Sequence, residues 1–184
     1  MKPVDVLSPA DAGRRDFLRI GVMGALVLST VSFSAMLTGC ASAPPARGMR
    51  VFRESDLPAL RAIMPVVMAG AMPSDDSLPS VLEESILSLD ALLSTNSRAG
   101  QKQVQQLFDF LTFPPTRYTV AGMNTDWASA TPAAVNAFLE KWRHSRVALL
   151  RGGYIGLCQM MDMNWYLQPR SWAAINYIPP RVVG

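Results

Sequence analysis

The spacing of apolar residues constrains the fold of this chain more than any other feature of its sequence. From residue 57 onward, leucines, isoleucines, valines and methionines recur at intervals of three and four, which is the period of a helix with one buried face. Alternating apolar and polar runs, which predict strands, are nearly absent. The sequence therefore predicts an all-α fold, a small irregular helical bundle.

Prolines and turn residues divide this pattern into about five or six helices. The first helix begins near residue 54 and should kink or end at Pro65, and the second follows the turn-rich segment 72–79. A third helix is expected over residues 100–113, where it meets two prolines. These three segments predict the first half of the bundle.

Thr131 followed by Pro132 is a typical helix start, an N-cap with proline at the first helical position. The preceding stretch, residues 116–131, has no sustained period. We therefore expect one long irregular loop there, and long loops in compact domains tend to be functional or covered.

The last long helix, expected over residues 146–167, is apolar on more than one side. One stripe consists of Tyr154, Leu157, Cys158, Met161 and Trp165, and other apolar residues lie elsewhere on the helix: Leu149, Ile155, Met160 and Met163. Such a helix must be covered on several faces. The cover can come from the domain itself, as for the central helix of a bundle, or from a partner protein.

The first 39 residues have the zones of a secretory leader. Arg14 and Arg15, followed by Phe17 and Leu18, form the signature of the twin-arginine export signal, and the apolar run 20–37 follows them. The twin-arginine route carries proteins that are already folded, often around a cofactor. We expect this leader to be cleaved.

Leu37 to Cys40 resembles a lipobox, in which the cysteine is acylated and becomes the new N-terminus. Two or three acyl chains hold a protein durably on a membrane. The sequence thus predicts a lipidated Cys40 and flexible tether over 40–53 and a helical domain over 54–184. The alternative is an uncleaved anchor; in both cases the domain faces the periplasm. An aspartate directly after the lipidated cysteine would favour retention in the inner membrane. This chain has Ala41 at that position, which favours the outer membrane.

The net charge and the number of cysteines limit the kinds of molecule that we expect this chain to bind. Removing the leader takes away four basic and three acidic residues and lowers the formal net charge from +3 to +2, so nothing predicts a nucleic-acid partner. If Cys40 is lipidated, Cys158 is the remaining thiol. An unpaired cysteine in an exported protein indicates either a buried inert thiol or an intermolecular disulfide.

Motifs for catalysis are absent from the sequence. His144 is the single histidine, and no CxxC pair, CxxCH, GxGxxG or Walker loop occurs. The acidic pairs Asp75–Asp76 and Glu83–Glu84 are explained by solvation and by the helix dipole. We therefore predict no catalytic, cofactor-binding or metal-binding residue in this chain.

Large aromatic residues gather near the C-terminus: Trp165, Tyr166, Trp172 and Tyr177. Aromatic side chains anchor both cores and interfaces, so the segment is either a packed cap or a docking surface. Its residue order resembles the gluconate 2-dehydrogenase subunit 3 family. The resemblance rests on a helix ending in Trp-Tyr, a proline-led turn, Ser-Trp-Ala-Ala-Ile and a tyrosine before prolines: Trp165, Tyr166, Pro169, Ser171, Trp172, Ala173, Ala174, Ile175, Tyr177 and Pro179–Pro180.

That family supplies the small subunit of membrane-bound, FAD-dependent GMC oxidoreductases that act on sugars, sugar acids and other alcohols. By this resemblance, the chain is a non-catalytic escort whose signal exports a large flavoprotein subunit, with a cytochrome c subunit as a possible third member. The candidate partner interface is Cys158, Trp165, Tyr166, Trp172 and Tyr177. The alternative function is a stand-alone envelope lipoprotein that binds another periplasmic protein or ligand.

Overall fold

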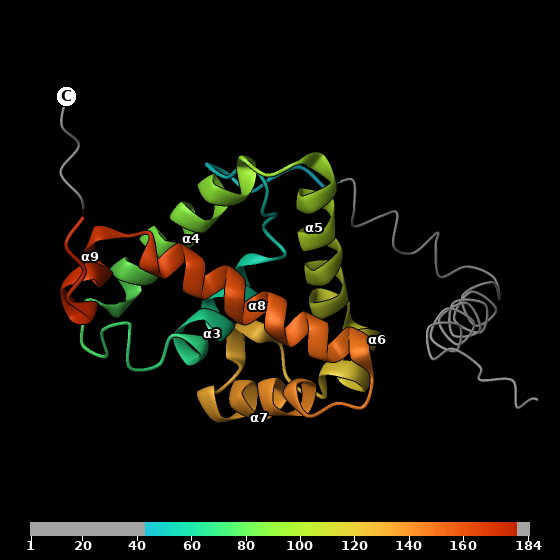
Figure 1. Ribbon diagram of the computed structural model, residues 1–184. Helices are drawn as coiled ribbons and strands as arrows, with labels where there is room; N and C mark the ends of the chain where they lie inside the picture. Colours follow the sequence, from blue (N-terminus) through green and yellow to red (C-terminus); the bar gives the residue numbers. More distant parts are fainter. Residues whose placement is uncertain (1–42, 180–184) are drawn as a thin grey trace, which may run out of the picture. The chain divides into compact units, whose positions relative to one another are not determined.

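The structure, a computed structural model, describes residues 43–179 (Figure 1). Every regular element in this part of the chain is helical, and no strand occurs in it. The predicted all-α class is therefore confirmed. The predicted signal and lipidation residues lie outside the described residues: Arg14, Arg15, Phe17, Leu18 and Cys40.

Within residues 43–179, five longer helices form the body of the domain: α3 (Leu57–Val67), α4 (Leu78–Ser94), α5 (Arg98–Thr112), α7 (Pro132–Arg143) and α8 (Ala148–Tyr166). Shorter elements connect or follow them: α6 (Pro114–Thr116), η1 (Arg117–Ala121), η2 (Trp127–Ser129), α9 (Pro169–Trp172) and η3 (Ala173–Ile175). The longer helices match the apolar periodicity of the sequence.

Local signals in the sequence account for several helix ends. The Thr131 side chain accepts a hydrogen bond from the backbone N–H of Ala134 (3.3 Å), so the predicted N-cap is confirmed. Pro65 lies inside α3, which ends two residues later at Val67. The proline therefore precedes the helix end closely, as expected.

The stretch 116–131 differs from the long irregular loop that the sequence predicts. It contains the π-helical turn η1 and the 3-10 turn η2. The indole N–H of Trp127 donates to the carbonyl of Leu111 (2.8 Å), and Arg117 pairs with Asp126. These long-range contacts organise the stretch, which is why local periodicity does not reveal it.

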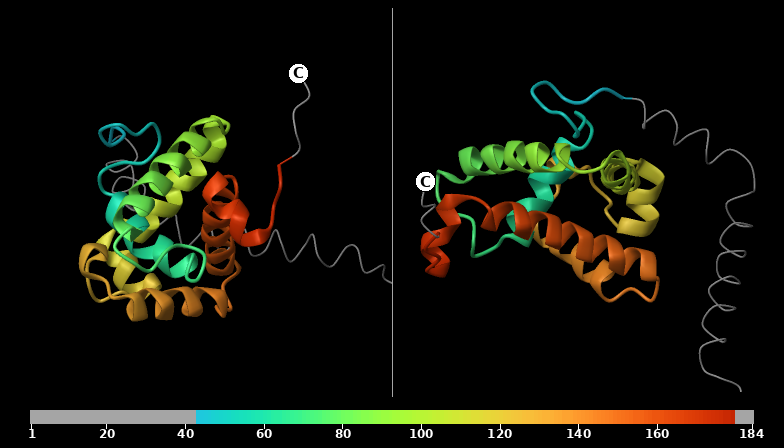
Figure 2. Two further views of the ribbon diagram at one scale, coloured as in Figure 1. Left: turned by 90° about the vertical axis from the view of Figure 1, so that its left-hand side faces the viewer. Right: turned by 45° about the horizontal axis from the view of Figure 1, so that its top comes forward.

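The core lies around α3, which contacts α4, α5, α7 and α8 (Figures 1 and 2). Leu60 and Ile63 of α3 are fully buried. Aromatic pairs extend the core on either side, with Phe52 against Phe108 and Phe138 against Trp142 at centroid distances of 5.2 and 4.8 Å. One apolar interior therefore connects all the longer helices.

The N-terminal strap, residues 43–56, packs against this core. The sequence predicts a flexible tether over 40–53, but Val51 and Phe52 are buried in the structure. The carboxylate of Asp90 on α4 accepts hydrogen bonds from three successive backbone N–H groups of the strap, those of Arg50, Val51 and Phe52, at 2.6, 2.9 and 2.9 Å. The tether prediction is wrong for this part, because one buried carboxylate fixes the strap.

A buried ion network fixes the end of the strap. Arg53 pairs with Asp56 (2.9 Å) and with Asp109 of α5 (2.6 Å), and all three side chains are almost fully buried. Burial lowers the pKa of Arg53, but hydrogen bonds and the charges of Asp56 and Asp109 outweigh it and raise the pKa overall. The guanidinium therefore stays charged, pairs with the residue that precedes α3, and ties the strap to α5.

Candidate functional site

The candidate functional features of the described residues are two apolar surfaces. In residues 43–179, no group of three or more histidine, cysteine or acidic side chains is placed to hold a metal ion. Within the same range, no helix is both long and apolar enough to cross a membrane. His144 is exposed at the end of α7, with its Nε2 atom 3.1 Å from Glu140.

The C-terminal aromatic segment, residues 166–178, begins where α8 ends. Pro169 starts α9, and Asn176 ends η3 in the left-handed region with φ 52°. Asparagine is among the residues that tolerate this conformation. The segment therefore turns back on itself directly after the last long helix (Figure 2).

Local contacts hold this segment in place. The indole N–H of Trp172 donates to the carbonyl of Tyr166 (3.1 Å), and its ring meets that of Tyr177 edge to face at a centroid distance of 5.4 Å. An ion pair between Arg170 and Glu84 attaches α9 to the start of α4. The aromatic groups are thus positioned without being buried.

The sequence-predicted interface residues fall into different environments. Trp165 is only 5% exposed and belongs to the core, whereas Tyr166 and Tyr177 are 44% and 48% exposed. Trp172 is half-buried. Other apolar side chains of the segment are also exposed: Leu167, Ile175 and Ile178. The structure therefore brings Tyr166, Trp172 and Tyr177 together in an exposed apolar segment and places Trp165 beneath it.

Cys158 lies away from that segment. It is half-buried and faces Tyr154 and the end of α7, two turns of α8 before Tyr166. Burial is the main cause that raises the pKa of its thiol, and a hydrogen bond to Cys158 raises the pKa of the Tyr154 hydroxyl. A raised pKa leaves less thiolate at neutral pH, which slows disulfide exchange.

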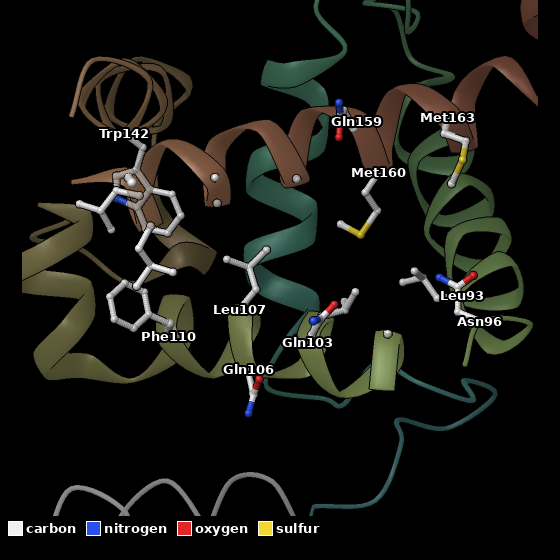
Figure 3. A pocket seen from close by; sticks show the side chains of 18 residues that line it. Leu93, Asn96, Gln103, Gln106, Leu107, Phe110, Trp142, Gln159, Met160 and Met163 are labelled. Atoms are coloured by element: carbon white, nitrogen blue, oxygen red, sulfur yellow. The ribbon is translucent and has the colours of Figure 1, made fainter. Parts of the chain in front are cut away.

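A second surface is a groove of about 1020 Å³ between α5 and α8 (Figure 3). Apolar residues, glycines and uncharged amides line it, and no lining residue is charged. Figure 3 shows Leu107 and Met160 pointing into it from opposite sides. Trp142 and Phe110, 6.1 Å apart, close one end, and Leu93 lies near the other. We call this the α5–α8 groove.

The sequence pattern alone does not predict this groove. Val104 and Leu107 belong to the apolar stripe predicted for α5, but both are only half-buried and line the groove. Leu149 and Met163 belong to the additional apolar side predicted for α8. The sequence therefore shows that α5 and α8 have more apolar residues than one buried face needs. The location of the groove, however, depends on how α5 and α8 pack against each other.

No protein-family model, curated protein or solved structure matches this chain. The resemblance to the gluconate 2-dehydrogenase subunit 3 family therefore stays a prediction from the residues that carry it.

Proposed function

We propose that this chain is a non-catalytic small subunit that escorts, stabilises and anchors a flavin-dependent dehydrogenase of the GMC class acting on alcohols or sugars. FAD is held by the large partner subunit and haem c by a further cytochrome subunit. The chain itself is lipid-anchored through Cys40 in the cell envelope and faces the periplasm, with the outer membrane favoured.

The exposed C-terminal aromatic segment is the observation that best supports this proposal. It coincides with the residues that carry the family resemblance, and it presents Tyr166, Tyr177 and Ile178 to solvent at 44%, 48% and 87% exposure. Clustered apolar and aromatic side chains on a soluble surface are typical of protein interfaces. Tyrosine and tryptophan are also the residues most enriched at binding hot spots.

To escort and stabilise a partner protein, the chain needs only to bind it. A protein that binds the folded form of a partner, and not the unfolded form, stabilises the partner by mass action. Twin-arginine export of folded proteins lets the partner take up FAD before it crosses the membrane. One signal, at Arg14 and Arg15, then serves both subunits.

The test is to replace Arg14 and Arg15 together by lysine and to follow the flavoprotein of the same complex. We expect both proteins to accumulate in the cytoplasm, because the partner has no route of its own. Arg19→Lys is the matched control, since it makes the same change outside the arginine pair. A flavoprotein that still reaches the envelope would refute the escort role and favour the stand-alone lipoprotein.

A further inference from the structure

The side of α8 that borders the α5–α8 groove is apolar and exposed. Leu149, Ile155 and Met163 are 75%, 50% and 50% exposed. We define the open face of α8 as Leu149, Gly152, Ile155, Gly156, Gln159 and Met163, which contains no charged residue; all but Ile155 line the groove. The sequence predicts that a helix apolar on several sides is covered, yet the groove leaves this side of α8 open to solvent. The open face is therefore a candidate surface for association.

The spacing along the open face indicates that a helix covers it. Leu149, Gly152, Gly156, Gln159 and Met163 follow one another at alternating intervals of three and four. This is the spacing of the seam along which two helices pack in a coiled coil. These residues span positions 149–163 of α8 (Ala148–Tyr166), and Figure 1 shows that this helix is straight, so the face offers a long contact.

The glycines of α8 leave room for a close approach. A side chain at Gly153 would meet the Trp142 ring at 2.6 Å, so the packing of α7 on α8 explains that glycine. No atom lies within 4 Å of the Cβ position of Gly152 or Gly156. Glycine destabilises a helix relative to alanine. Within one copy, neither of these two glycines is needed to avoid a clash.

The open face is complementary to itself when two copies run antiparallel. Leu149 lies seven residues before Gly156, and Met163 lies seven residues after it. A two-fold axis at Gly156 therefore brings Leu149 of one copy next to Met163 of the other copy. Arg151 lies five residues before Gly156, and Asp162 lies six after it on the same flank of the helix. Each copy's Arg151 then falls opposite the other copy's Asp162.

Both charged residues can take part in such a pair. Arg151 and Asp162 are exposed. Arg151 donates one hydrogen bond to the carbonyl of Ser145 (2.7 Å), and a guanidinium has five N–H donors. Opposite charges on one flank therefore favour the antiparallel orientation, because a parallel two-fold pair would place this flank of the two helices on opposite sides of the seam and bring no Arg151 next to an Asp162.

We infer that α8 packs antiparallel against α8 of a second copy across a two-fold axis near Gly156. The pairing is isologous, the commonest symmetry of soluble oligomers. It uses residues 149–163 and leaves the C-terminal aromatic segment to a different protein. The inference does not rest on the escort proposal, and either can fail without the other.

Disulfide trapping in the full chain tests the pairing. Two differently tagged copies, each carrying Cys158→Ser, are produced together, one with Leu149→Cys and the other with Met163→Cys, and are treated with a mild oxidant. We expect about tenfold more cross-linked dimer from this mixture than from either variant alone, because two copies of one position lie about 21 Å apart along the axis, beyond the reach of a disulfide. Cys158→Ser alone is the control for other thiols.

No mixed dimer, or equal self-linking of each variant, would overturn the antiparallel pairing. Cross-links that form only to another protein would overturn it as well. A charge exchange provides a second readout: Arg151→Glu should lower the yield of mixed dimer, and adding Asp162→Arg to the same chain should restore it. A double variant that links no better than Arg151→Glu would refute the proposed orientation.

Discussion

The two ends of the described chain are held in opposite ways. The N-terminal strap is fixed by buried charged groups, with Asp90 accepting three backbone hydrogen bonds and Arg53 pairing with Asp56 and Asp109. The C-terminal aromatic segment is held by a few surface contacts and leaves its tyrosines exposed. The strap is therefore part of the interior, whereas the aromatic segment has apolar surface available for contact.

The largest effect should come from breaking the ion network of the strap. Arg53→Ala leaves the carboxylates of Asp56 and Asp109 buried without their cation, and we expect a loss of about 3–5 kcal/mol in the free energy of unfolding. Urea denaturation measures it. Arg61→Ala is the control, because Arg61 and Glu83 form an exposed pair worth about 1 kcal/mol or less. Equal losses of unfolding free energy in Arg53→Ala and Arg61→Ala would show that burial does not make the Arg53 network more important than an exposed pair.

Removing the Asp90 carboxylate should release the strap itself. Asp90→Ala leaves three backbone N–H groups without their acceptor, and we expect a loss of about 3 kcal/mol in unfolding free energy. Amide exchange of Val51 and Phe52 should also become faster. Asp90→Asn, which keeps one carbonyl oxygen, should lose less; unchanged exchange in Asp90→Ala would show that the strap is held by other contacts.

The glycines of α8 provide a matched comparison within one helix. Gly153→Ala forces a methyl group against Trp142 and should destabilise the domain by about 1–3 kcal/mol. In a single copy no atom lies within 4 Å of the Cβ position of Gly152, so Gly152→Ala should stabilise the unpaired chain by about 0.5–1 kcal/mol, because alanine suits a helix better than glycine. Thermal denaturation distinguishes the two. The same sign for both variants would contradict the packing of α7 on α8.

The exposed pair of Arg61 and Glu83 should show a small dependence on pH. A hydrogen bond from Arg61 lowers the pKa of Glu83 in the folded state, so the contribution to stability is present above the unfolded pKa and is lost as the pH falls through the folded pKa. Glu83→Gln should therefore cost less than about 1 kcal/mol at pH 7. The cost should begin to fade below the usual glutamate pKa of about 4.3 and disappear once the pH falls below the lowered pKa of the folded state.

The smallest effect on stability per substituted residue should come from the C-terminal aromatic segment. Tyr166→Ala combined with Tyr177→Ala should change the unfolding free energy by only about 0.5 kcal/mol per site, because both side chains are half-exposed. The same variant should lose its partner in co-purification. A large loss of stability would instead identify the segment as a cap of the fold.

Local rules identified the helices and the C-terminal aromatic segment, but neither the N-terminal strap nor the α5–α8 groove. Periodicity and the Thr131–Pro132 start predict the longer helices, because those signals lie within a few residues of each other. The strap could not be predicted, since its anchor, Asp90, is 39 residues from Val51 along the chain. The α5–α8 groove likewise depends on the pairing of two helices, which no local pattern specifies.

The escort role is tested most directly by purifying the tagged chain from detergent-solubilised envelopes and recording the visible spectrum of the eluate. Mass spectrometry then identifies each protein present. We expect a co-purifying FAD-containing oxidoreductase of the GMC class, lost in the variant with Tyr166→Ala and Tyr177→Ala. A colourless chain that elutes without a flavoprotein, from cells shown to produce one encoded beside it, would refute the escort role.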